Sequence, residues 1–191
     1  MSSSRVWLFR GLGVVAIGLM LLSWFMPWWI CTVDAIYMLN RGFIKIRPWG
    51  LEHNLGSFAG HIAGSEMPVW FAPLAWAYLG ICIAALLFAA WIKNKVIRLI
   101  GRNFNLSKLI IGGVGISYIF VAVIAFVYAK IQTAAFGVNF IGYTYFQVDP
   151  HAGGYGDLNA SLQWGYWLTY GVGLLLIALA FLRNSILGKT E

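Results

Sequence analysis

The residues of this chain best suited to chemistry are three histidines, His53, His61 and His151. Carboxylates lie in the same two stretches of sequence, at Asp34, Glu52, Asp149 and Asp157. Imidazole and carboxylate groups together bind copper, zinc or iron. The spacing of eight between His53 and His61 is not that of a recognised ligand motif, and it would rotate two helical side chains by about 80°. The histidines are therefore a candidate metal site, with surface hydrogen bonding as the alternative.

The two cysteines and the remaining motifs offer no catalytic machinery. Cys82 lies in the middle of an apolar segment, where a thiol packs as a small apolar group, and Cys31 lies at the end of another. The sequence contains no C-x-x-C pair, so it predicts no iron–sulfur, zinc or thioredoxin-like site. It also contains no P-loop, nucleophile elbow or H-E-x-x-H motif. We therefore expect no catalytic residues.

The elements that position these residues are membrane spans. Hydrophobic residues make up 61% of the 191 residues and charged ones 10%, whereas soluble domains carry about 25% charged residues. Segments of about 20 apolar residues, the length that crosses a bilayer, occur at 8–29, 68–92, 109–130 and 162–183. The prediction is an all-α integral membrane protein, a bundle of four transmembrane helices forming one domain over residues 1–191.

The apolar cores of these spans contain no Asp, Glu, Lys, Arg or His. Pumps and proton relays place such groups inside the membrane, so an ion-coupled transporter acting alone is not expected. All three histidines lie outside the spans, which excludes an intramembrane haem held by two histidines. Bound lipid, quinone or pigment remains compatible with the spans.

Basic residues predict the orientation, because they favour cytoplasmic loops. One side of the predicted topology holds Arg5, Arg10, Lys93, Lys95, Arg98, Arg102, Lys108, Arg183 and Lys189. That side carries a net charge of +8 and the other side −1, within a chain total of +7. We therefore expect cytoplasmic N- and C-termini. The net positive charge of the chain is explained by this topology, and it predicts no nucleic-acid partner.

The connection 93–108 concentrates five of these residues, namely Lys93, Lys95, Arg98, Arg102 and Lys108. Each basic group near an anionic leaflet adds around 1 kcal/mol of attraction. The connection is expected to bind lipid headgroups, and docking of an acidic partner subunit is the alternative.

Two long outer loops, 30–67 and 131–161, are expected to be structured. The first predicts a short helix or strand near 34–46, a turn at 47–50 and a weak helix across 52–63. In the second, period-two spacing around Gly142 predicts a small β-hairpin, and 149–157 is typical of an irregular loop. Asn159-Ala160-Ser161 matches a glycosylation sequon close to the last span.

Small and aromatic residues suggest how the helices pack and where they end. Small residues at fourfold spacing allow close helix contacts, and they occur at Gly80, Ala84, Gly113, Ser117, Gly165, Thr169 and Gly173. A large residue at Gly113 or Gly173 is therefore expected to disrupt packing. Aromatic residues mark the membrane interface, most heavily on the outer side at Trp24, Trp28, Trp29, Trp70, Trp164 and Trp167.

These features favour a non-catalytic accessory subunit of a larger membrane complex of respiratory, photosynthetic or oxidative type. Its partners would be membrane lipids and other membrane subunits. One alternative is a metal-dependent oxidase or monooxygenase component that uses the outer-loop histidines, by analogy with copper membrane monooxygenases. A second is a tetraspan organiser, since the layout of four spans and a longer first outer loop resembles that of claudins. The cysteine pair of that family's first loop is absent here.

Overall fold

A computed structural model of the chain describes residues 3–35, 41–55, 67–92, 96–99, 102–135, 137–149 and 154–187. Its helices are α1 (Ser3–Phe25), α2 (Phe71–Trp91), α3 (Leu106–Ala135) and α4 (Trp164–Leu187). All four are long and apolar enough to cross a membrane, which confirms the four predicted spans and indicates a multi-pass membrane protein.

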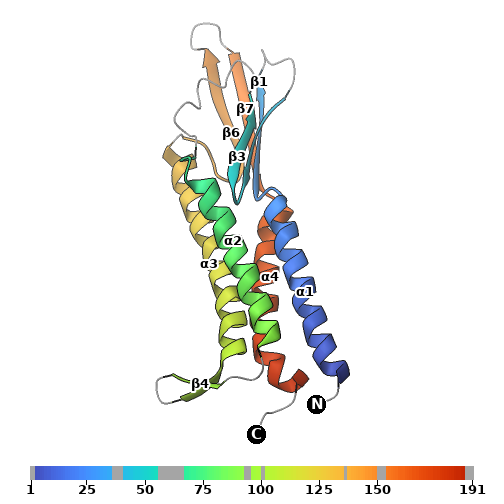
Figure 1. Cartoon of the computed structure of the whole chain (residues 1–191). Helices are drawn as coiled ribbons and strands as arrows, with labels where there is room; N and C mark the ends of the chain where they lie inside the picture. Colours follow the sequence, from blue (N-terminus) through green and yellow to red (C-terminus); the bar gives the residue numbers. More distant parts are fainter. Residues whose placement is uncertain are drawn as a thin grey trace. The chain divides into compact units, whose positions relative to one another are not determined.

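The contacts divide the chain into two compact units, shown in Figure 1. The helical unit comprises 1–22, 76–122 and 168–191, and so contains most of α1, α2 and α4 and the first half of α3. The sheet unit comprises 23–75 and 123–167 and includes the second half of α3.

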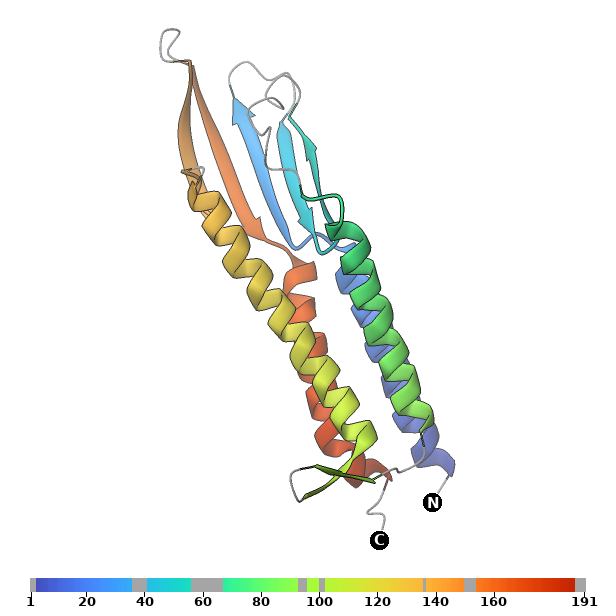
Figure 2. The ribbon, with the colours of Figure 1, turned by 60° about the vertical axis from the view of Figure 1, so that its left-hand side comes forward.

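The prediction of an all-α fold is wrong, because both long connections form strands of one antiparallel sheet. Its strands are β1 (Trp29–Ala35), β2 (Gly42–Arg47), β3 (Gly50–Asn54), β6 (Gly142–Asp149) and β7 (Gly154–Leu162). Their order is β3-β2-β1-β7-β6, and Figure 2 shows them side by side. The centre of the sheet joins the two connections, since β1 of the first pairs with β7 of the second from Trp29–Leu162 to Ala35–Gly156.

The local predictions for these connections have mixed outcomes. The turn at 47–50 is present between β2 and β3, but residues 52–54 belong to β3 and not to a helix; 56–63 lie outside the described residues. The second connection does contain an antiparallel hairpin, formed by β6 and β7, but its turn does not lie at Gly142, because Gly142 begins β6 and pairs with Ala160 of β7. The segment 149–157, predicted to be irregular, contains the end of β6 and the start of β7.

The sheet has an apolar and a polar face because side chains alternate along each strand. On β1, Trp29 and Cys31 are 5% and 1% exposed, whereas the next residue, Thr32, is exposed on the other face. The remaining residues of the apolar cluster come from β2, α3, β7 and the segment before β6: Ile44, Ile46, Phe126, Ala129, Phe140, Leu158, Ala160 and Leu162. This cluster is the core of the sheet unit.

A glycine-based helix cap returns the chain from α3 to this core. Gly137 has a φ of +69°, which glycine adopts without strain. Its N–H donates to the carbonyl of Ala134 at 3.0 Å, and the next N–H, of Val138, donates to that of Thr133 at 2.9 Å. This pair of bonds is the Schellman motif, which ends a helix and reverses the chain. The ring of Phe140 then stacks on Trp29 with centroids 5.9 Å apart.

The helical unit is held by close backbone approach and by a few polar contacts. A Cβ atom on Gly115 would lie 2.8 Å from the carbonyl oxygen of Gly173, so these glycines bring α3 against α4. The hydroxyl of Tyr118 on α3 donates to the carbonyl of Met20 on α1 at 3.2 Å. The hydroxyl of Ser107 donates to the carbonyl of Ala89 at 2.8 Å, which ties the start of α3 to the end of α2.

The connection between α2 and α3 also forms strands that the sequence did not predict. β4 (Val96–Leu99) and β5 (Arg102–Asn105) pair as an antiparallel hairpin in the helical unit. The side chain of Asn105 accepts a bond from the N–H of Ser107 at 3.1 Å and so caps α3.

Cys31 is expected to resist thiol reagents in the folded protein. Burial raises the pKa of its thiol from an ordinary 9.0 to about 11, so very little thiolate, the reactive form, exists at pH 8. Thr32→Cys places a thiol one residue along, on the exposed polar face, and should react rapidly with N-ethylmaleimide. Peptide mass spectrometry after timed labelling measures both rates. Equal rates would contradict the alternation of β1.

The same pKa shift predicts a stability change at high pH. Because the folded pKa lies above the unfolded one, the neutral thiol of Cys31 contributes stability that is fully present below pH 9 and is lost as the pH rises through about 11.

Candidate functional site

The three predicted metal-binding histidines are not assembled by the described residues. His53 is exposed near the end of β3, where it pairs with Ile44 of β2. His61 and His151 lie outside the described residues. Within the described part of the chain, no three His, Cys, Asp or Glu side chains form a group that could hold a metal ion.

The small residues predicted for helix packing fall into two groups. Ser117, Gly165, Thr169 and Gly173 contact other parts of their own unit. The hydroxyl of Ser117 lies 3.1 Å from that of Tyr78, which links α3 to α2. A Cβ on Gly165 would lie 2.7 Å from the carbonyl oxygen of Pro27, so α4 begins against the link between α1 and β1.

The second group consists of Gly80, Ala84 and Gly113, which are exposed on their helices. A Cβ on Gly80 or on Gly113 would meet no atom within 4 Å. Ala77, which the sequence analysis did not single out, is exposed as well. Ala77, Gly80 and Ala84 follow one another at helical spacing and form one surface of α2, here called the α2 small face.

The predicted interface aromatics also fall into two groups. Trp24, Trp28 and Trp29 are only 1%, 4% and 5% exposed, and they pack inside the sheet unit. The indole N–H of Trp29 donates to the carbonyl of Phe140 at 2.7 Å. Exposed indoles, free to lie at a membrane interface, occur at Trp70, Trp164 and Trp167.

The predicted headgroup-binding residues are only partly described. Lys93 and Lys95 lie outside the described residues, whereas Arg98 and Arg102 belong to β4 and β5. Lys108 is half-buried near the start of α3.

The polar face of the five-stranded sheet holds a hollow of about 140 Å³, here called the polar hollow. Its walls come from β1, β6, β7 and the residue before β2: Thr32, Asp34, Arg41, Tyr143, Asp157 and Asn159. The strand register produces this arrangement, since Thr32 is opposite Asn159 and Asp34 is opposite Asp157, while Tyr143 is the partner of Asn159 on β6.

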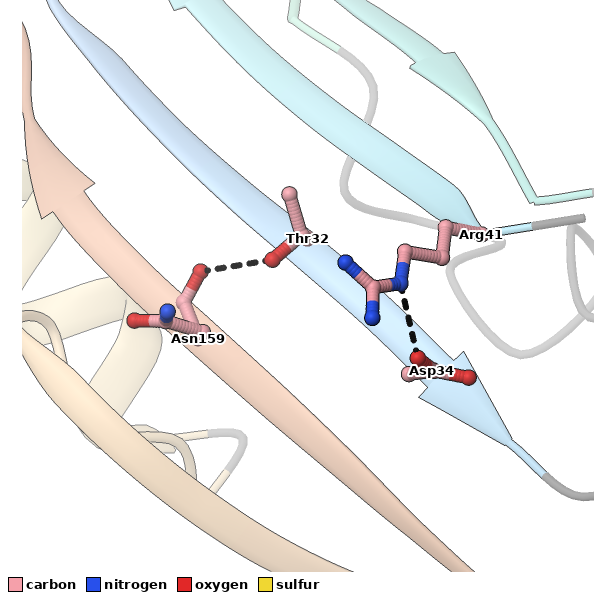
Figure 3. Close-up of polar contacts among 4 residues, drawn as sticks. All are labelled: Thr32, Asp34, Arg41 and Asn159. Carbon is pink, nitrogen blue, oxygen red and sulfur yellow. Dashed lines mark hydrogen bonds and ion pairs between the residues drawn. The ribbon is translucent and has the colours of Figure 1, made fainter.

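Two contacts fix part of the polar hollow, as Figure 3 shows. Arg41 Nε donates to Asp34 Oδ2 at 2.9 Å, and the two side chains form an exposed ion pair. The Thr32 hydroxyl donates to the carbonyl oxygen of Asn159 at 3.4 Å. Asp157 makes no ion pair with any residue that the structure describes.

The opposed carboxylates of Asp34 and Asp157 are unfavourable for the sheet, because like charges directly across two strands repel. Arg41 offsets part of this repulsion, at the cost of holding a long and largely exposed side chain in place. Sequence reasoning considered these carboxylates only as metal ligands. It missed Thr32, Arg41 and Tyr143, since the hollow forms only where β1 meets β7, and the pairing of Thr32 with Asn159, 127 positions apart, leaves no local pattern.

No known protein-family model matches this chain, and no curated protein matches its sequence.

Proposed function

We propose that this protein is a non-catalytic subunit of a larger membrane complex, and that the α2 small face is where a helix of another subunit packs. The observation that carries this proposal is the exposure of Ala77, Gly80 and Ala84 on one surface of a membrane-spanning helix. No atom of the described chain would lie within 4 Å of a Cβ on Gly80.

The physics of helix association in lipid supports this use of the α2 small face. Lipid tails are as apolar as leucine, so helices associate through close packing and interhelical hydrogen bonds. The chain already shows such packing where Gly115 and Gly173 bring α3 against α4. The α2 small face offers small residues at helical spacing without a partner helix in the described chain.

The complex would be respiratory, photosynthetic or oxidative, with the spans packing against partner helices, lipid, quinone or pigment. The long apolar surfaces of α2 and α3 suit such contacts, since large side chains such as Ile81, Phe88 and Phe120 are 56–68% exposed. These side chains can pack equally against lipid tails and against a partner's helices, so they support the proposal less directly than the α2 small face.

The proposed orientation places both termini and the β4–β5 connection in the cytoplasm and the five-stranded sheet outside. The supporting observation is the excess of basic residues on one side of the spans. Labelling the Thr32→Cys variant in intact cells with a membrane-impermeant maleimide tests this orientation. Labelling only after the cells are permeabilised would contradict it.

Filling the α2 small face is expected to release this subunit from its complex. The double variant Gly80→Leu, Ala84→Leu adds two large side chains where a helix would approach, at two exposed positions, of which Gly80 has no atom within 4 Å of its Cβ position. We expect at least a tenfold loss of co-purifying subunits after mild extraction from native membranes. Quantitative mass spectrometry of the tagged complex measures the loss.

Gly171→Leu is the matched control for this experiment. Gly171 is also exposed with no atom within 4 Å of its Cβ position, but it lies on α4 beside the large exposed side chains of Trp167 and Leu174. Co-purification should survive this change. If Gly80→Leu, Ala84→Leu retained every partner, the α2 small face would not be the contact. If Gly80→Leu, Ala84→Leu released only further copies of this same chain, the contact would join identical subunits, which favours the tetraspan organiser.

A further inference from the structure

The polar hollow lies on the part of the protein that must face water. Within the described residues, β3 and β6 are each paired along only one edge. Open sheet edges do not occur in the hydrocarbon of a membrane, because their N–H and C=O groups would be left without hydrogen bonds. The hollow is therefore reached from an aqueous phase. Its volume of about 140 Å³ greatly exceeds the ~10–15 Å³ that one water molecule needs, so a small ring can enter.

The walls of the polar hollow combine hydrogen-bond donors and acceptors within one small area. Asp34 and Asp157 present carboxylate acceptors, and Arg41 presents a guanidinium with several donors. Asn159 and Tyr143 each carry a group that can both donate and accept. A ligand with several adjacent hydroxyl groups matches such a set, because each hydroxyl donates one bond and accepts others. Bonds to the charged groups are also the stronger ones.

Exposed tyrosines border the polar hollow on the same face of the sheet. Tyr143 is 60% exposed and forms part of the wall, and Tyr145, opposite Asp157 in the register, is 79% exposed. A tyrosine offers an apolar ring face beside a polar hydroxyl. The C–H face of a sugar ring can pack on such a ring while its hydroxyls reach the polar walls.

The charge of the polar hollow argues against a metal ion as its ligand. Arg41 lies 2.9 Å from Asp34, so a cation approaching Asp34 would meet a guanidinium in the same space. Of the two carboxylates of the hollow, only Asp157 forms no ion pair with a described residue. A calcium ion takes six to eight oxygen ligands, usually including several carboxylates, which this arrangement does not offer. A neutral ligand needs neither Arg41 nor Asp34 to move.

We propose that the polar hollow binds the ring of a neutral carbohydrate, with Asp157, Asn159 and Arg41 holding its hydroxyl groups and Tyr143 packing on its C–H face. This binding is independent of the proposed subunit role, because the α2 small face and the polar hollow share no residue. The protein would thereby attach to a glycan in the aqueous phase beside the membrane.

The test uses the full-length protein in phospholipid nanodiscs, since sugar-headgroup detergents would compete for the polar hollow. The probe is an array of immobilised neutral oligosaccharides built from hexoses and N-acetylhexosamines. We expect at least one to bind, and Asp157→Ala or Tyr143→Ala to weaken that binding at least about tenfold, since each removes a wall of the hollow. Asp157→Ala also removes the cross-strand repulsion with Asp34, so this variant should fold at least as well as the unmodified chain.

Tyr155→Ala and Glu52→Ala are the matched controls. Tyr155 is 61% exposed on β7, where it pairs with Gln147, and Glu52 lies on β3; neither lines the polar hollow. Both variants should keep full glycan binding. The proposal would be overturned by an array on which nothing binds, or by glycan binding that Asp157→Ala and Tyr143→Ala leave unchanged. A third outcome would replace the glycan proposal with a cation site. In that case no glycan binds, and calorimetry detects calcium binding that is lost in Asp157→Ala.

Discussion

Replacing Gly173 by leucine is expected to destabilise the helical unit by about 3 kcal/mol, the upper part of the usual range for overpacking. A Cβ at this position would overlap Ile119 Cγ1 and would lie 3.0 Å from the carbonyl oxygen of Gly115. The side chain of Ile119 could turn away, but the Gly115 carbonyl belongs to the backbone of α3. The two helices must therefore separate. Thermal unfolding of the purified variant, followed by the helical circular dichroism signal, measures the loss.

Gly113→Leu is the control for this prediction. Sequence spacing alone expects disruption at both Gly113 and Gly173, because each fits the pattern of small residues. The structure distinguishes them, since Gly113 is exposed on α3 and a Cβ there meets no atom within 4 Å. Its leucine variant should unfold within about 0.5 kcal/mol of the unmodified protein, as surface substitutions usually do. Equal destabilisation of both variants would contradict the described contact between α3 and α4.

Replacing Trp29 by alanine is expected to destabilise the sheet unit by about 4 kcal/mol, which is typical of removing a buried tryptophan. Its ring is 5% exposed and stacks on Phe140 with an interplanar angle of 3°. Its indole N–H also donates to the Phe140 carbonyl at 2.7 Å. The change therefore leaves a cavity and a carbonyl that has lost its partner. Hydrogen exchange of the β1, β2 and β7 amides measures the loss directly.

Trp164→Ala provides the comparison, because Trp164 begins α4 and is 79% exposed. Its removal should leave the exchange of the sheet amides unchanged. Faster exchange in Trp164→Ala than in Trp29→Ala would contradict the assignment of Trp29 to the core. The sequence alone assigned both Trp29 and Trp164 to the membrane interface. The comparison separates that role from a packing role in the core.

The helices were predictable because a membrane span needs only length and apolar composition, both of which are local properties. The sheet was not, although its alternation is visible in hindsight. Trp29 to Val33 reads as the apolar end of the first span, and the chain turns into β1 after only a short link at Pro27. The alternation around Tyr143 and Tyr145 was recognised, but the strand was paired with the wrong neighbour. Pairing of β1 with β7 depends on contacts far apart in sequence, which no local pattern reveals.

The two candidate sites also differ in how far the sequence predicts them. The small residues of α2 are recognisable from their spacing, but whether Gly80 or Gly173 contacts the same chain depends on how the helices are rotated. The polar hollow could not be predicted, because Asp34 and Asp157 meet only through the strand register. Sequence reasoning grouped the carboxylates with the histidines by residue type. Of those histidines, only His53 is among the described residues, and it is exposed on β3.

The most direct test of the subunit proposal is the mass of the intact assembly, measured by native mass spectrometry after gentle extraction from the native membrane. One chain weighs 21.2 kDa. The proposal predicts a larger particle that contains this chain together with different subunits, and that loses this chain when Gly80 and Ala84 are both replaced by leucine. A particle of a single 21.2 kDa chain, unchanged by those substitutions, would contradict it.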